Sequence, residues 1–152
     1  QVIYQEGGGT NGLAIYVRNS RIYVGGWNRS TNWNSGTYLN TSITNNQWHH
    51  VVLTLDTIKD DPNTQANAFS GYLDGAFFAS GAGSQLSSHT GAISIGNVDG
   101  GTRRDNSTSN GQYFKGYIDE VEIYNIALDA RAVKNIYNYE NELKNYDGTD
   151  RP

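Results

Sequence analysis

Apolar and polar residues alternate with a period of two along much of this chain. The alternation is clear in Leu13–Val17 and in Val51–Leu55, and it predicts strands that bury one face. Further strand signals fall at Val2–Gln5, Arg21–Val24, Tyr38–Ile43, Phe69–Leu73, Phe77–Ala79, Ala92–Ile95 and Tyr113–Tyr124. Many short strands separated by glycine-rich turns indicate a sandwich or a barrel.

Turn and helix signals lie between and after these predicted strands. Asn19-Ser20 lies between two strand signals and predicts a hairpin, and Asp74-Gly75 predicts a second tight turn. The helix signal follows Leu128, with Asp129 as the expected N-cap and apolar residues at helical spacing after it. We expect this helix to run to about residue 143 or 144.

Several segments together resemble the laminin-G-like, concanavalin-type jelly roll. They are Val2–Gly8, Leu13–Val17, Arg21–Val24, Gln47–Asp56, Gly71–Gly75, Gly91–Gly96 and Phe114–Leu128, in the order found in that family. The resemblance implies an all-β fold, a two-sheet antiparallel jelly-roll sandwich with one short C-terminal helix. It covers residues 1–144, and residues 145–152 read as a polar tail or linker.

Members of that family usually begin with two more strands than this sequence has. The resemblance therefore implies that the N-terminal strands are missing, either removed or supplied by another chain. A sandwich without an outer strand has an unpaired sheet edge, so we expect self-association or pairing with a neighbouring domain.

The amino-acid composition narrows the range of possible functions. The net charge is −4 and only 17% of the 152 residues are charged, so the clustered Lys and Arg that nucleic-acid binding needs are missing. No apolar run approaches the ~20 residues that span a bilayer, and no membrane insertion is expected. A surface rich in Gly, Asn, Ser, Thr and Tyr suits an extracellular, secreted or cell-surface protein that contacts glycans, although turn-rich β folds share this composition.

A catalytic site is not expected. Related glucanases place several carboxylates on one strand, and Asp119, Glu120 and Glu122 superficially suggest this, but the three-carboxylate spacing is absent. In a strand, Glu120 and Glu122 would share one face and Asp119 would lie on the other. The adjacent His49 and His50 would point to opposite faces, so they cannot chelate one ion together.

The resemblance also implies a structural calcium ion. Asp119 stands where the family's strand carboxylate is expected, and the turn at residues 6–9 could add carbonyl oxygens. Asn97, Asp99 and Asp105 form a second candidate cluster. Calcium takes 6–8 oxygen ligands, so either set needs carbonyl groups and water to complete it. The alternative for Asp119 is a buried carboxylate that caps backbone amides.

The candidate glycan-binding residues are Trp27, Asn28, Asn32, Trp33 and Tyr38. Sugars stack their C–H faces on aromatic rings, and amides pair with sugar hydroxyls. We expect the three aromatic side chains to form an exposed patch. The alternative is that the tryptophans cap the core.

Trp48 leads into an apolar strand, and we expect it to be buried. The sequence as a whole predicts a non-catalytic extracellular module that binds a glycan or polysaccharide, or mediates adhesion, and is stabilised by calcium. The alternative is a structural subunit of an extracellular assembly, completed by a strand from a neighbouring chain or a copy of itself.

Overall fold

The computed structural model describes residues 1–89, 91, 93–104 and 107–142. Its strands and single helix are β1 (Val2–Gly7), β2 (Asn11–Arg18), β3 (Arg21–Asn28), β4 (Thr37–Ser42), β5 (Val51–Leu55), β6 (Gln65–Leu73), β7 (Ala76–Gly83), β8 (Ser94–Ile95), β9 (Val98–Arg104), β10 (Ser107–Gly111) and α1 (Ala130–Asn141).

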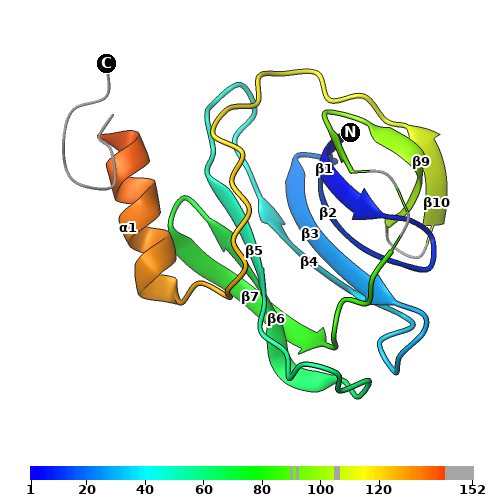
Figure 1. Cartoon of the computed structure of the whole chain (residues 1–152). Helices are drawn as coiled ribbons and strands as arrows, with labels where there is room; N and C mark the ends of the chain where they lie inside the picture. The colour runs from blue at the N-terminus through cyan, green and yellow to red at the C-terminus, as the bar shows by residue number, and fades with distance from the viewer. Residues whose placement is uncertain (90, 92, 105–106, 143–152) are drawn as a thin grey trace.

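The strands form two main antiparallel sheets (Figure 1). The larger has the order β4-β3-β2-β1-β8 and the smaller the order β5-β6-β7, while β9 and β10 form a separate hairpin. This arrangement confirms the predicted two-sheet all-β fold with one C-terminal helix.

Two tight turns set the register of these sheets. Asn19 and Ser20 join β2 to β3 with φ of 51° and 55°, and Asp74 and Gly75 join β6 to β7 with φ of 53° and 72°. Positive φ at both central positions is the geometry of a type I′ turn, whose twist matches that of the flanking strands. Both hairpins predicted from the sequence are confirmed.

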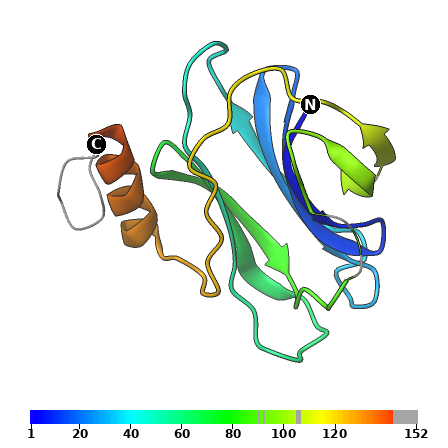
Figure 2. The same cartoon turned by 45° about the horizontal axis from the view of Figure 1, so that its top comes forward.

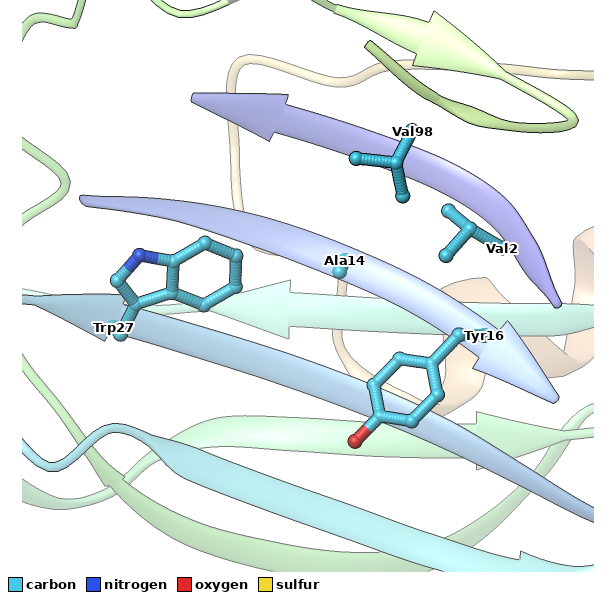
Figure 3. Packing of buried hydrophobic residues seen from close by; sticks show 5 residues of the cluster. All are labelled: Val2, Ala14, Tyr16, Trp27 and Val98. Atoms are coloured by element: carbon cyan, nitrogen blue, oxygen red, sulfur yellow. The ribbon is translucent and has the colours of Figure 1, made fainter. Parts of the chain in front are cut away.

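One face of the larger sheet is covered by the β9–β10 hairpin. Val2, Ala14, Tyr16 and Trp27 lie on this face and Val98 packs on them from β9, all of them buried (Figure 3). The hairpin itself was not predicted, because its residues are mostly Gly, Thr, Ser, Asn and Arg and carry no apolar alternation.

The other face of the larger sheet packs on the smaller sheet. Val24, Trp33 and Phe69 are buried between the two sheets. The sheets meet through β4 and β7, where the Thr37 hydroxyl donates a 2.5 Å hydrogen bond to the Ala82 carbonyl. Figure 2 shows the two sheets side by side, with α1 beside the smaller sheet.

The C-terminal third departs from the prediction. Tyr113–Tyr124 forms no strand. Of the short strand expected at Ala92–Ile95, Ser94–Ile95 is present, and Ala92 lies outside the described residues. The helix is confirmed: the Asp129 carboxylate accepts a 2.7 Å hydrogen bond from the Ala132 amide, as an N-cap should. It ends at Asn141, and the expected continuation to 143 or 144 lies outside the described residues.

Candidate functional site: a cleft between the sheets

The two sheets separate away from the β4–β7 contact and leave a cleft of about 2000 Å³. Its floor is apolar. Ile3 of β1 and Leu13, Ile15 and Val17 of β2 line it from the larger sheet, and β5 lines it from the smaller sheet. Small-molecule pockets are usually about 300–1,000 Å³, so this cleft is wide enough for an extended ligand or a chain segment.

The free edge of β5 borders this cleft. In the described part of the chain β5 pairs on one side only, with β6. An unpaired edge presents backbone N–H and C=O groups that can accept another strand.

Asp74 holds the segment that leads into β5. Its carboxylate accepts a 3.0 Å hydrogen bond from the His50 amide and lies 2.9 Å from His49 Nδ1. The other ring nitrogen of His49 lies 2.9 Å from the Thr44 carbonyl. These contacts fix the loop that carries Trp48 at the mouth of the cleft.

Most of residues 112–128 border the cleft on the outer side, and Figures 1 and 2 show this segment in yellow to orange between β10 and α1. Tyr117 is 87% exposed, Ile123 71% and Ile126 67%. Exposed apolar surface beside an apolar cleft is typical of an interaction site.

Trp48 and Tyr117 form an aromatic pair at the mouth of the cleft. Their ring centroids are 6.4 Å apart with an interplanar angle of 36°, and 68% of Trp48 is exposed. The exposed Asn45, Asn46 and Gln47 precede Trp48 and also line the cleft. Two open rings beside neutral amides are chemically suited to a sugar.

A family model described as the concanavalin A-like lectin/glucanases superfamily matches residues 1–134. The chain belongs to this family. The predicted resemblance is thereby confirmed, along with the sandwich fold. No helix in the described part of this lectin/glucanase-superfamily domain is long and apolar enough to cross a membrane.

Among solved structures, the domain is similar to residues 221–444 of an S-layer domain-containing protein from Clostridium thermocellum. The two are 18% identical with a TM-score of 0.44, and the match covers 90% of this chain and 62% of the other. This chain therefore spans less than two thirds of that structure. No curated protein matches the domain.

The predicted exposed aromatic patch is wrong. Trp27 is fully buried, and its indole N–H donates to the Gly8 carbonyl at 2.8 Å. Trp33 is 3% exposed, and its ring packs on Phe69. The tryptophans fill the two faces of the larger sheet, so their ring faces are covered. Trp48, which was expected in the core, is the exposed one.

The other candidate glycan-binding residues do not share one surface either. Asn28 is fully buried, and Tyr38 is half-buried against the cluster beneath the β9–β10 hairpin. Asn32 is exposed and donates to the Asn63 side chain at 3.0 Å. The sequence signal for the aromatic pair was the polar run just before Trp48, which indicates a loop rim rather than the start of a buried strand.

The structure describes three of the four candidate calcium ligands. The Asp119 carboxylate accepts a 2.9 Å hydrogen bond from the Glu120 amide, while Asp99 is exposed on β9 and Asn97 is half-buried just before it. Asp105 lies outside the described residues. Among the residues that are described, no three His, Cys, Asp or Glu side chains are grouped to hold a metal ion. A calcium site here would have to be built largely from carbonyl and amide oxygens.

The adjacent histidines were expected on one strand, but both precede β5, and they contact different groups. His50 Nε2 lies 3.5 Å from a Glu140 carboxylate oxygen of α1, and its ring packs near Tyr137. Burial lowers the pKa of His50, and the charges of Asp74 and Glu122 oppose this only in part. Partial burial also disfavours charged His49, but the hydrogen bonds to Asp74 and Thr44 outweigh it and raise the pKa of His49.

The raised pKa of His49 predicts a pH-dependent contribution to stability. The folded state binds the His49 proton more tightly than the unfolded state, so this stabilisation is complete below the unfolded pKa of about 6.5. It is lost as the pH rises through the folded pKa. His49→Gln should therefore lower the unfolding midpoint more at about pH 5.5 than at about pH 8. Urea unfolding of both proteins at the two pH values tests this, and an equal loss at both contradicts it.

Proposed function

We propose that this domain is a non-catalytic, extracellular carbohydrate-binding or adhesion module, and that Trp48 and Tyr117 form its glycan-contacting platform. The observation that carries the proposal is the exposed aromatic pair beside neutral amides at the mouth of the cleft. Membership of the concanavalin A-like lectin/glucanases superfamily supports a glycan ligand.

The carboxylates on the cleft wall support a non-catalytic role. Asp119 is engaged by the Glu120 amide, and Glu122 accepts a hydrogen bond from the Tyr124 hydroxyl. Glycosidases place two carboxyl groups on either side of the scissile bond. Here the acidic residues follow one another along a segment that forms no strand.

Glycan-array binding tests the platform. Trp48→Ala should abolish or weaken binding by about 10-fold or more, because stacking on an aromatic ring contributes roughly 1–3 kcal/mol by analogy with other flat ligands. Tyr113→Ala is the matched control, since Tyr113 is equally open at 69% exposure but does not line the cleft. Retained binding in Trp48→Ala, or an equal loss in Tyr113→Ala, contradicts the assignment.

Calcium is part of the same proposal as a stabilising ion. A ligand that binds only the folded state raises its stability by mass action. Millimolar calcium should raise Tm by several degrees, and chelator should reverse the shift. Asp119→Ala should remove the shift if Asp119 is a ligand. Identical melting curves with calcium and with chelator contradict this part of the proposal.

A second candidate function is a structural subunit of an extracellular assembly, completed by a strand from a neighbouring chain. The open cleft with the free β5 edge supports it. A native mass far above 16.7 kDa is expected in that case, and a monomer by light scattering at high concentration speaks against it.

A further inference from the structure

We propose that the cleft accepts one β-strand whose inward side chains are apolar and whose outward side chains are Lys or Arg. The proposal rests on the second candidate function and specifies the chemistry of the completing strand. Three observations carry it: the free edge of β5, the apolar floor, and the charge of the cleft walls.

The free edge of β5 and the apolar floor of the cleft determine how an added strand would lie. A strand added to β5 would extend the smaller sheet over Leu13, Ile15 and Val17, which line the cleft from β2. Alternate side chains of the added strand would point at this row, because side chains alternate across a strand. Every second residue of the ligand should therefore be apolar.

The charged residues on the cleft walls determine which charge the added strand should carry. Six carboxylates line the cleft, those of Glu6, Asp74, Asp119, Glu120, Glu122 and Glu140, against one Arg and one Lys, Arg18 and Lys115. His49 and His50 also line it, and they lie beside Asp74 and Glu140 respectively. Three of the acids belong to the outer segment 112–128, which the outward side chains of an added strand would approach. Opposite charges across an interface favour correct partners, and like charges are disfavoured.

The negative charge of the cleft disfavours one occupant, the corresponding segment of a second copy of this chain. Segment 117–128 has the alternation of a strand, but it carries three carboxylates and no Lys or Arg. Placing this segment from a second copy into an acidic cleft would bring like charges together. The structure therefore favours a basic strand from a different sequence over exchange between identical copies.

The test uses a capped synthetic peptide of alternating Lys and Val, seven residues long, which spans about 23 Å as a strand. Binding should slow hydrogen exchange of the β5 amides that point away from β6 and shift the emission of the exposed Trp48. Trp48→Phe identifies the origin of the emission change. A peptide with Glu in place of Lys, and one with Pro at the central Val, should both bind at least about 10-fold more weakly.

A charge-reversed protein distinguishes charge-specific peptide binding from non-specific binding. Glu120→Lys with Glu122→Lys should weaken the basic peptide about 10-fold and strengthen the acidic one. Asp99→Lys with Glu142→Lys is the control, because it makes the same change of charge at exposed sites that do not line the cleft. It should leave both affinities nearly unchanged.

Several results overturn the proposal. Absence of basic-peptide binding does so, as does equal binding of the acidic or proline peptide. Protection, in the free chain, of the β5 amides that do not bond to β6 also does so: a dimer would assign the cleft to a second copy, and a monomer would assign it to the chain's own outer segment. If the native mass is high but the protein binds basic and acidic peptides equally well, completion of the sheet by a neighbouring strand remains supported. The requirement that this strand be basic is then rejected.

Discussion

Trp33→Ala should destabilise the domain by ~3–5 kcal/mol, the cost of truncating a large aromatic side chain in a packed core. Trp33 packs on Phe69 with ring centroids 5.6 Å apart, and its indole N–H donates to the Thr37 hydroxyl at 2.9 Å. The ring packs directly on the backbone at Gly26, because a Cβ added there would lie only 2.4 Å from it. Urea unfolding measures the loss as a lower midpoint at an unchanged slope.

Trp48→Ala is the matched control for this prediction. The same truncation at a 68% exposed side chain should change the free energy of unfolding by only about 0.5 kcal/mol. Trp33→Phe keeps most of the buried volume, and it should fall between the two. If Trp48→Ala costs as much as Trp33→Ala, the assignment of Trp33 to the core and Trp48 to the surface is wrong.

Asn28→Ala should cost about 2–3 kcal/mol because it leaves buried groups without partners. The fully buried Asn28 amide donates to the Gln85 carbonyl at 2.8 Å and to the Ser87 hydroxyl at 2.9 Å. Its side-chain oxygen accepts from the Ser30 amide at 3.0 Å. Asn28 thus ties the segment after β7 to the end of β3.

Two variants sharpen the Asn28 prediction. Asn28→Asp keeps the acceptor for the Ser30 amide but loses both donors and places a carboxylate near the Gln85 carbonyl, so it should cost at least as much as Asn28→Ala. Asn32→Ala removes an exposed side chain whose partner, Asn63, is also exposed. It should change stability by about 0.5 kcal/mol or less, and a larger loss would contradict this placement.

Local signals predicted the elements that depend on local chemistry. The turn at Asn19-Ser20 and the Asp129 cap each follow from a few adjacent residues, and both are present. Residues 117–124 have the same kind of alternation as β5 but form no strand. A strand also needs a partner, and partners are set by contacts far apart in the sequence.

The burial of the tryptophans could not be predicted for a similar reason. Trp33 sits in an Asn- and Ser-rich loop, which by composition indicates a surface. It is buried because that loop folds over the end of the larger sheet and brings the ring against Phe69, more than thirty residues further along the chain. Trp48 precedes an apolar strand, but it lies where the two sheets have separated.

The proposed glycan platform depends on the exposure of Trp48, the open tryptophan of the three, at the mouth of the cleft. This exposure can be tested by fluorine NMR of protein labelled with 5-fluorotryptophan, with a soluble paramagnetic agent that broadens exposed resonances. One of the three resonances should broaden strongly, and that resonance should be the one absent from Trp48→Phe. Broadening of the Trp27 or Trp33 resonance, or protection of the Trp48 resonance, would contradict the account.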